Sequence, residues 1–524
     1  MEEHVESHPT IQMRKIKDPI HDYITISQLL SSIIDTKQFQ RLRYVKQLGT
    51  SYYVWPGASH NRFEHCLGVA HLALSMVEHL RQKQPELGIT ERDLNCVVIA
   101  AVCHDLGHGP FSHVWDGLFI PTVAPTKQWK HEDASKMMFN FLLEENEIDL
   151  PKEDVRFILA LIDGEPSQCS PSEKPFLFDI VANKRNGLDV DKFDYIARDS
   201  YMIGEPSTIS LARLIESARV IDNEICYDIK DVNQLHEICY TRFKLHKMIY
   251  NHKTAKAIEY MIVDALVVAD GYLKIAEQIE IPQKFLYLTD DIIGRIEMSE
   301  EPALKPAQDI FARIRTRHLY KFVDGRVVEW EQRGLFRNCI TRERIVEEAR
   351  RLAGEDKSDI DLGELTPESI IVDHAVMHYG MKEKNPLDFV KFYSKRNPNT
   401  CAHAQKGDYS MLMPKEFAEV NLTIFTKHPK YLGLVQAGYR AVLQSIPDVP
   451  TPTEPPSTPR RGHSKNPSLN SISASSFTKV PLTYAPTTPG RKPVSRDLTL
   501  KRTHEGSSLE SVERDDRKPK RQAT

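Results

Sequence analysis

The sequence predicts a mainly α-helical protein with a smaller α+β lobe near its carboxyl end and a disordered tail. Three observations support this prediction. From about Ile24 onward, apolar residues recur every three to four positions over most of the chain, as they do on the buried side of helices. Short runs that alternate apolar and polar residues gather late in the sequence, and after about Ser445 the apolar periodicity stops. We therefore divide the 524 residues into a flexible start at 1–12, a helical domain at 13–330, an α+β lobe at 331–445 and a tail at 446–524.

The helical pattern is clearest in five segments, which are residues 28–34, 70–80, 94–103, 155–162 and 235–276. Glycine and proline interrupt it at Gly57, Gly107, Gly109 and Pro110, which predicts loops where functional side chains from different helices can meet. A mixed segment follows from about Lys284. Its alternating runs at 368–373 and 389–393 predict short strands of the smaller lobe.

Composition argues against two classes of protein. With 40% hydrophobic and 27% charged residues, the chain is typical of a soluble protein with a large core. The eight cysteines form no Cys-x-x-Cys pair, so we predict reduced thiols rather than the disulfide framework of a secreted protein. The first ten residues lack the apolar segment of a signal peptide, and the run Cys96–Cys103 is too short to cross a bilayer. We expect no membrane partner.

Charge is spread unevenly over a net value of −4. From Asp448 to Thr524, 14 basic residues outnumber 8 acidic residues, so the body of the protein is acidic. The tail is rich in Pro, Ser and Thr, and ordering it would cost more entropy than burial could offset. Its basic run Arg517–Arg521 predicts nuclear import, with a cytoplasmic pool or a merely solvated basic end as alternatives. Thr458 and Thr488, each followed by proline, resemble sites of proline-directed kinases.

A metal centre is the strongest chemical prediction. His104 and Asp105 close an apolar helical segment and offer a nitrogen and an oxygen ligand next to each other. His65 adds a second imidazole and Asp191 a second carboxylate. This mixed set of ligands suits iron, manganese, zinc or magnesium. Such an ion lowers the pKa of bound water and polarises a phosphoryl oxygen, which indicates a metal-dependent hydrolase.

The order of these ligands resembles the signature of the HD-domain phosphohydrolases, which are helical enzymes that hydrolyse phosphate esters. Residues 35–43, 47–48, 53–65 and 183–199 are also similar to the vertebrate SAM-and-HD-domain deoxynucleoside triphosphate triphosphohydrolases. The resemblance covers about residues 15–445 and implies that the helical domain is an HD domain. We expect no SAM domain, because only about a dozen residues precede Lys15.

The reaction that the resemblance implies converts a deoxynucleoside triphosphate (dNTP) and water into a deoxynucleoside and inorganic triphosphate. One tightly bound Fe, Zn or Mn ion at the HD site and Mg with the nucleotide are the implied cofactors. His113 is implied to give a proton to the departing 5′-oxygen, with His108, Asp116 and His131 beside the α-phosphate. The implied substrate-binding residues are Gln47, Leu48, Arg62, Lys192, Tyr195, Asp199, Arg242, His246 and Tyr250.

Within that set, Gln47 and Asp199 are implied to hold the 3′-hydroxyl, while Leu48 and Tyr250 crowd the 2′ position and exclude ribonucleotides. Arg62, Lys192 and Arg242 supply the positive charge that a triphosphate needs. Spacing agrees with part of this scheme: Arg62 shares a helix face with His65, and Asp191, Tyr195 and Asp199 form one stripe. Arg242, His246, Tyr250 and Lys253 predict a second polar stripe on one helix, with a solvated face as the alternative.

The resemblance further implies a homotetramer that GTP and dNTP activators assemble. Lys15, Ile16, Asp35, Gln40 and Arg43 match a guanine-nucleotide site, for which a surface cluster of acids and bases is the alternative. Val54, Trp55, Arg219, Lys230, His252 and Lys253 match a neighbouring deoxynucleotide site. This chain departs from the family there: Lys17 stands where the family has Asn, and Asp228 and Thr400 stand where arginines are expected. The loss of two phosphate-binding cations predicts weaker nucleotide-driven assembly and an altered preference at this site.

Two other functions stay open. An HD phosphodiesterase or a nucleoside 5′-monophosphatase would use the same metal ligands, although the cations favour a triphosphate. A nucleic-acid-binding or scaffold protein with weak or lost catalysis would use the basic tail, and single-stranded nucleic acid is a candidate partner in either case. The complete set of metal ligands favours an enzyme.

Overall fold

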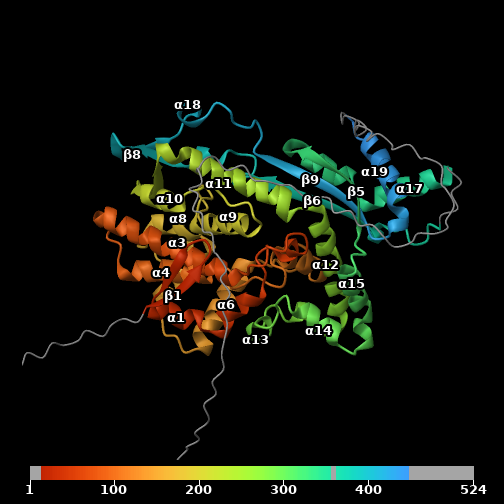
Figure 1. Ribbon diagram of the computed structural model, residues 1–524, viewed down its shortest axis with the longest axis horizontal. Helices are drawn as coiled ribbons and strands as arrows, with labels where there is room; N and C mark the ends of the chain where they lie inside the picture. The colour runs from red at the N-terminus through yellow and green to blue at the C-terminus, as the bar shows by residue number, and fades with distance from the viewer. Residues whose placement is uncertain (1–12, 356–360, 448–524) are drawn as a thin grey trace, which may run out of the picture. The chain divides into compact units, whose positions relative to one another are not determined.

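The computed structural model describes residues 13–355 and 361–447. The predicted flexible start, the import signal Arg517–Arg521, Thr458, Thr488 and nearly all of the predicted tail lie outside these residues. The prediction of a mainly helical fold with a few small sheets is confirmed (Figure 1). Among the described residues, no helix is both long enough and apolar enough to span a bilayer.

The helices that carry or surround the site are long and largely buried. They are α3 (Arg62–Lys83), α4 (Glu91–Cys103), α6 (His131–Glu145), α7 (Lys152–Asp163), α9 (Val190–Met202), α11 (Val232–Leu245) and α12 (Lys253–Leu273). Shorter helices complete this region: α1 (Gln28–Ile34), α2 (Lys37–Gln40), α5 (Ile120–Val123), α8 (Phe178–Val181), α10 (Leu211–Ser217), α13 (Pro282–Phe285), α14 (Ile292–Met298) and α15 (Lys305–Arg315). The later helices are α16 (Arg333–Cys339), α17 (Arg342–Glu355), α18 (Lys406–Tyr409) and α19 (Leu432–Gln444).

Within the described residues, three small sheets accompany the helices. Strands β1 (Arg14–Asp18) and β2 (Asp22–Ile26) form an antiparallel hairpin. The second sheet has the order β3 (Arg219–Ile221), β4 (Glu224–Asp228), β7 (Lys391–Ser394) and β8 (Asn397–His403), with β4 and β7 parallel. The third is antiparallel, with β9 (Ala418–Thr426) between β5 (Lys321–Glu329) and β6 (Ile370–His378).

Two clusters of buried apolar side chains form the core. The larger cluster is built mainly from α3, α4, α7, α9, α11 and α12, and it includes Phe392 and Phe425 from the late strands. The smaller cluster lies where α17 and α19 pack on the third sheet, around Leu422, Ile424 and Tyr439 (Figure 1). Because side chains from beyond residue 331 join the larger cluster, the predicted helical domain and the predicted α+β lobe share this cluster. The domain boundary between residues 330 and 331 therefore stays a prediction.

The prediction of one continuous helix over residues 235–276 was wrong, because the structure divides this segment into two helices. Helix α11 ends at Leu245, a π-helical turn covers His246–Tyr250, and α12 begins at Lys253. The His252 side chain accepts a hydrogen bond from the backbone N–H of Thr254 and so caps α12, which starts a new helix instead of continuing the first. The predicted stripe from Arg242 to Lys253 therefore lies on two helices and a turn.

A buried capping box fixes the start of α4, the helix that ends at the His-Asp pair. Asp93 Oδ2 accepts hydrogen bonds from the Thr90 N–H at 2.8 Å and from Lys174 Nζ at 2.8 Å, and the Asp93 side chain is 3% exposed. Burial raises the pKa of Asp93, but the bonds from Lys174 and Thr90 outweigh it, so this pKa lies below its ordinary value of 3.8. The folded state therefore favours the charged carboxylate.

We expect Asp93→Asn to lower the free energy of unfolding at pH 7 by about 1–2 kcal/mol, because a buried charge-assisted cap is lost. A depressed folded pKa contributes stability that is present above pH 3.8 and lost as the pH falls through the folded pKa. The gap between variant and wild type should therefore close below about pH 4 in urea titrations. Asp133→Asn, at the matching third position of α6 but 59% exposed, is the control. An equal gap at every pH would contradict the assignment.

Candidate active site and metal centre

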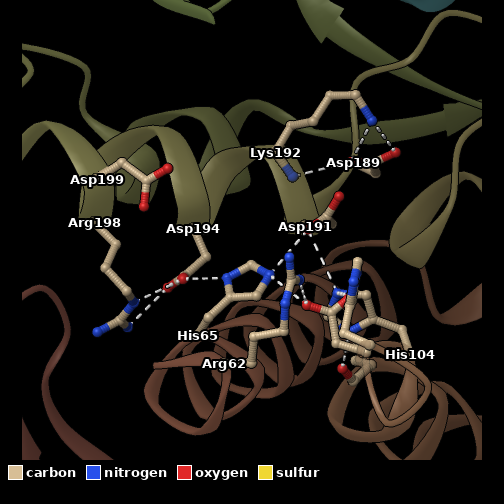
Figure 2. A network of polar contacts seen from close by, with 12 residues as sticks. Arg62, His65, His104, Asp189, Asp191, Lys192, Asp194, Arg198 and Asp199 are labelled. Atoms are coloured by element: carbon tan, nitrogen blue, oxygen red, sulfur yellow. Dashed lines mark hydrogen bonds and ion pairs between the residues drawn. The ribbon is translucent and has the colours of Figure 1, made fainter. Parts of the chain in front are cut away.

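Three helices bring the predicted metal ligands together. His65 lies in the first turn of α3, His104 and Asp105 follow the end of α4, and Asp191 lies in the first turn of α9 (Figure 2). Asp191 Oδ1 is 3.1 Å from His65 Nε2 and 3.5 Å from His104 Nε2. Carboxylate oxygens of Asp105 lie 3.7 Å from His65 Nε2 and 3.4 Å from His104 Nε2. The structure therefore brings His65, His104 and Asp191 around one point, with Asp105 next to both imidazoles.

The two imidazoles are oriented for a metal. His104 Nδ1 is 2.8 Å from the Ala101 carbonyl oxygen, and His65 Nδ1 is 2.8 Å from Asp194 Oδ2. Since a carbonyl or a carboxylate can only accept, both Nδ1 atoms carry the proton, and in a neutral ring Nε2 keeps the lone pair. The buried Nε2 of His104 makes no hydrogen bond in the described part of the chain. The ligand atoms of His65, His104 and Asp191 lie within 4.8 Å of one another, a set that fits a divalent ion, and Asp105 adjoins both imidazoles.

The carboxylates of the ligand set are charged. Burial raises the pKa of Asp191, but His104 and His65 beside it outweigh burial and hold this pKa below its ordinary value. Burial also raises the pKa of Asp105, but the opposing influences, of which the positive charge of the Arg62 guanidinium is the largest, together outweigh burial. The pKa of Asp105 therefore also lies below its ordinary value. Anionic oxygens are the form that coordinates a metal.

A cluster of histidines lies directly beside Asp105. His108 Nε2 is 3.2 Å from Asp105 Oδ1, and the His108 ring stacks on His131 with 4.0 Å between ring centroids. His113 meets His108 edge to face at 5.2 Å. Asp116 Oδ2 is 2.9 Å from His131 Nδ1, so the structure places the four predicted catalytic residues side by side.

The protonation of these histidines differs. Burial lowers the pKa of His131, but the hydrogen bond from His131 to Asp116 and the charge of Asp116 have a larger, opposite effect. The pKa of His131 therefore lies above its ordinary value. Protein atoms packed around the ring and the positive charges of Arg62 and His131 lower the pKa of His113 to about 4, although this residue keeps an exposed surface. In the protein without substrate, His131 therefore retains its proton to higher pH than His113 does.

The loop that carries His113 has an unusual backbone. Phe111 and Ser112 have φ values of 58° and 55°, in the left-handed region that side chains with a Cβ rarely adopt. Asp290 Oδ1 accepts the Phe111 N–H at 2.7 Å, and Ser112 Oγ donates to the Lys46 carbonyl at 2.7 Å. These contacts hold the loop in a strained form, and His113 after it meets the rings of His108 and His131.

Arg41 supports the segment between the His-Asp pair and this loop. Its guanidinium, 3% exposed, donates to the carbonyl oxygens of Leu106 and His108 at 3.2 and 2.7 Å. It also donates to the carbonyl oxygens of Phe285 and Leu288 at 3.2 and 2.6 Å. Burial lowers the pKa of Arg41 to about 9. Sequence reasoning did not single out this residue, although it lies within a segment that carried the resemblance.

A second polar cluster lies further along α9. Asp199 Oδ2 accepts the Tyr250 hydroxyl at 2.6 Å, and Asp199 Oδ1 is 2.7 Å from His60 Nε2. The Gln47 backbone N–H donates to the His60 carbonyl, and its side-chain Oε1 is buried with no hydrogen bond among the described residues. Asp191, Tyr195 and Asp199 share one helix, as predicted. The structure thus joins Gln47, Asp199 and Tyr250, while Leu48 adjoins Gln47 at the start of the turn Gly49–Tyr53.

The predicted phosphate-binding cations have protein partners. Arg62, 3% exposed, donates to Asp105 through Nη1 and to Ser112 Oγ through Nε at 2.8 Å. Lys192 Nζ lies 3.0 Å from Asp189 Oδ2, and Asp189 is also the N-cap of α9 (Figure 2). Both cations therefore lie next to the ligand set, but neither is a free charge.

Arg242 keeps part of its hydrogen-bonding capacity. Its Nη1 donates to the His378 carbonyl at 2.6 Å, whereas its Nε is buried with no hydrogen bond in the described part of the chain. His246 packs edge to face on Tyr250, with 4.9 Å between ring centroids. Burial raises the pKa of Tyr195, although nearby Arg242 opposes it. The end of α11 and the π-helical turn that follows it thus bring Arg242, His246 and Tyr250 close to α9.

A cavity of about 230 Å³ opens beside the ligand set. Its lining includes His104, Asp105, His131, Asp189, Asp191 and Lys192. Predicted metal ligands, a predicted catalytic histidine and a predicted phosphate-binding lysine therefore border the same space.

The residues predicted for the guanine-nucleotide site gather at one surface. Gln40 Oε1 accepts from Arg43 Nε at 2.7 Å, and Asp35 pairs with Arg14 at 2.8 Å. Arg14 was not among the predicted residues. It neighbours Lys15 and Ile16 on β1, where Lys15 is exposed and Ile16 packs on the larger core cluster.

The residues predicted for the second nucleotide site fall into two groups. Trp55, next to Val54, meets His252 edge to face at 5.0 Å between ring centroids, and Lys253 follows His252. Arg219 Nη2 instead reaches Asn399 Oδ1 at 3.5 Å, on the sheet that also leads to Lys230. Each group alone is an incomplete site.

The three departures from the family pattern have separate settings. Lys17 pairs with Asp22 across the β1–β2 hairpin. Asp228 is 7% exposed and caps the backbone N–H of Lys230 at 3.1 Å, so its position holds a turn where a cation was expected. Thr400 is an exposed residue of β8.

Sequence reasoning also missed His60 and Asp194, which contact predicted residues, and His21, which contacts Asp194. Asp194 follows Asp191 by three positions, which is the spacing that places two side chains on one helix face. His60 opens the same motif that holds His65. His21 gave no signal in the sequence, because it reaches the site from a distant hairpin.

Comparisons with known proteins agree with this geometry. Residues 62–198 match the HD domain family, and residues 209–381 match the family called HD associated region. The deoxynucleoside triphosphate triphosphohydrolase SAMHD1 homolog of Dictyostelium discoideum is 40% identical over 84% of this chain and 82% of its own length. The deoxynucleoside triphosphate triphosphohydrolase SAMHD1 of Homo sapiens is 43% identical over 79% of this chain and 70% of its own. A putative HD domain-containing protein of Acanthamoeba polyphaga mimivirus is 30% identical over 80% of this chain and 93% of its own.

We expect His104→Ala to lose the tightly bound metal, because an imidazole ligand with a free Nε2 is removed while its neighbours remain. Metal per chain should fall from about one to near zero after gel filtration, measured by inductively coupled plasma mass spectrometry. His318→Ala, an exposed histidine far from this motif in sequence, is the control and should keep its metal. Full metal content in His104→Ala would show that the ion is bound elsewhere.

Proposed function

The chain belongs to the family of the SAMHD1 deoxynucleoside triphosphate triphosphohydrolases, and on this premise we propose that it converts a dNTP and water into a deoxynucleoside and inorganic triphosphate. One observation carries the proposal beyond the family name. Asp191 of the ligand set and Asp199 of the second polar cluster lie on the same stripe of α9, about two turns apart. A metal position and a hydroxyl-binding position are therefore built on one rigid element.

The residues around the ligand set suit cleavage at the α-phosphorus. A divalent metal, when bound, supplies the Lewis acidity that polarises a phosphoryl oxygen and makes water a better nucleophile. Water attacks the α-phosphorus, the bond to the 5′-oxygen breaks, and His113 gives its proton to that oxygen. Asp116 orients His131, and His131 stacks on His108, so the histidines keep their places during the transfer.

His113 receives its proton when the substrate arrives. Its pKa of about 4 makes the ring neutral at pH 7 in the free protein. The negative charge of a triphosphate favours the imidazolium form and raises this pKa, so the acid is charged only beside its substrate. Lys192, which lines the cavity, supports binding of the distal phosphates, and Arg242, whose guanidinium lies at the end of α11 near α9, is the second cation that we assign to them.

The second polar cluster suits a deoxyribose. Asp199 and the unpaired Gln47 Oε1 can accept a hydrogen bond from the 3′-hydroxyl. The Tyr250 ring beside Asp199 and the Leu48 side chain limit the space for a 2′-hydroxyl. This arrangement rejects ribonucleotides by crowding as well as by hydrogen bonding.

The test is incubation of the protein with each dNTP, GTP and Mn²⁺ or Mg²⁺, followed by chromatography of the products. We expect a deoxynucleoside and intact triphosphate in equal amounts. His113→Ala should lower turnover about 100-fold or more, since general acid catalysis contributes about 10²–10⁴-fold. Its metal content should stay unchanged.

His318→Ala should turn over like wild type in the same assay. A monophosphate with pyrophosphate would identify a different bond and overturn the proposal. Unreduced triphosphate release by His113→Ala would remove this residue from the mechanism while leaving the reaction in place.

We further propose that the resident ion is Fe, Zn or Mn, that Mg accompanies the nucleotide, and that GTP and dNTP activators assemble a homotetramer. The cluster of Asp35, Gln40 and Arg43 supports a guanine-nucleotide site. The division of the second nucleotide site into two groups supports assembly, because copies of the chain could supply the groups to each other. The basic tail sequence supports a nuclear location and secondary binding of single-stranded nucleic acid.

We expect this assembly to be weak, because Asp228 and Thr400 do not supply the cations of the family pattern. Analytical ultracentrifugation with GTP and dNTP together should show a tetramer, and the protein alone should show smaller species. Thr400→Arg, at an exposed position of β8, should lower the nucleotide concentration needed for half assembly. A monomer under both conditions would contradict activator-driven assembly.

A further inference from the structure

Asp194 lies at the centre of a buried network behind the metal ligands. Its side chain is 0% exposed and contacts three residues from three parts of the chain. Oδ2 is 2.8 Å from His65 Nδ1 and 2.9 Å from Arg198 Nε, and Oδ1 is 3.0 Å from Arg198 Nη2 (Figure 2). Oδ1 is also 2.6 Å from His21 Nε2. The carboxylate therefore joins a predicted metal ligand to His21, which lies 173 positions earlier in the sequence than Asp194.

His21 reaches this network from the turn of the β1–β2 hairpin. Asp18 Oδ1 accepts the backbone N–H groups of Ile20 and His21 at 2.8 and 2.9 Å, which fixes the turn. Asp18 Oδ2 accepts Arg198 Nη1 at 2.8 Å, so the turn binds both members of the Asp194–Arg198 pair. The hairpin is thereby anchored to α9 by two buried side chains, His21 and Asp18.

The backbone makes room for this contact at Gly68 of α3. A Cβ atom at this position would lie 1.9 Å from Asp194 Oδ1 and 2.5 Å from Arg198 Nη2. Because atoms cannot approach so closely, only glycine lets the carboxylate come between α3 and the hairpin. The close approach indicates that the backbone at Gly68 is shaped to accommodate the Asp194–Arg198 pair.

The chemistry of the groups determines where the protons lie. A carboxylate can only accept, so His21 Nε2 and His65 Nδ1 are both N–H donors to Asp194. Arg198 already supplies two hydrogen bonds to Asp194, so the carboxylate keeps a charged partner without His21. The bond from His21 instead holds Oδ1 on the hairpin side, which leaves Oδ2 facing His65.

We propose that His21 is a positioning residue of the metal centre: through Asp194 it fixes the ring orientation and the tautomer of His65. The inference rests on the proposed function, because it assumes that His65 binds a metal. Groups that orient metal ligands in this way typically change metal affinity by about 10–100-fold when they are replaced. The hairpin is thus part of the metal site although none of its residues is a ligand.

His21 also borders a cavity of about 790 Å³ that lies on the far side of the network and is lined in part by His71, Ser75 and Tyr201. His71 supplies a matched control, because its ring lies 5.1 Å from that of His21 and borders the same cavity. No hydrogen bond from His71 to Asp194 is present among the described residues. A change at His71 alters the cavity but leaves the network in place.

The test measures binding of Co²⁺ to metal-free protein by chelator competition, together with the visible spectrum of the Co²⁺ site. We expect His21→Ala to weaken binding by about 10-fold or more and to change the spectrum, because the orientation of His65 is no longer fixed. His21→Gln, whose amide N–H can replace the Nε2–H donor, should restore affinity to within about 3-fold of wild type. His71→Ala should bind Co²⁺ like wild type.

Thermal unfolding of the metal-free proteins separates positioning from loss of fold. If His21→Ala unfolds in the absence of metal, His21→Phe, which fills similar space without a donor, takes its place against His21→Gln. Wild-type affinity and an unchanged spectrum in His21→Ala or His21→Phe would overturn the inference alone. Failure of the wild type to bind Co²⁺ at the site would overturn the proposed function as well.

Discussion

The packing of α9 against α3 is the constraint on which the rest of the site depends. It brings Asp191 to 3.1 Å from His65, although 126 positions separate them in the sequence. The same contact buries Asp194 and Arg198 behind His65 and directs Asp199 toward the second polar cluster. Since the side chains of a helix hold fixed positions relative to each other, this contact places the predicted metal ligand Asp191 and the predicted hydroxyl-binding residue Asp199 on one side of the same element.

Pairing of opposite charges offsets the free-energy cost of burying several carboxylates around the site. An isolated buried charge costs several kcal/mol, so each buried carboxylate near the site needs a partner. Asp194 is paired with Arg198, Asp105 with Arg62, and Asp189 with Lys192. Asp191 differs, because its nearest partners are the imidazoles of His65 and His104, which are neutral when they act as ligands. A divalent ion between them would supply the missing positive charge.

The β1–β2 hairpin connects the buried network behind the candidate metal ligands with the predicted guanine-nucleotide surface. Its turn holds the Asp194–Arg198 pair through Asp18 and His21, and its first strand carries Lys15 and Ile16 of the predicted guanine-nucleotide surface. Arg41 makes a similar connection, since it follows Gln40 and holds the carbonyls of Leu106 and His108. Residues of the predicted guanine-nucleotide surface are therefore near neighbours in sequence of side chains that contact Asp194 or the segment between the His-Asp pair and His113.

The sequence by itself indicated the helical character of the protein, the candidate metal ligands and the stripe from Asp191 to Asp199. The helices and the stripe depend on local spacing along the chain, whereas the candidate ligands lie far apart and were predicted from residue type and from resemblance to a family signature. Only the tertiary structure decided that β5 and β9 pair, that the segment after Tyr250 starts a new helix, and that Arg62 and Lys192 are already paired. It alone revealed His21, Arg41 and His60, because a hydrogen bond between residues that lie 65 or more positions apart leaves no periodic pattern. Spacing along a chain encodes which face of an element a residue occupies, whereas the partner that it meets depends on how those elements pack.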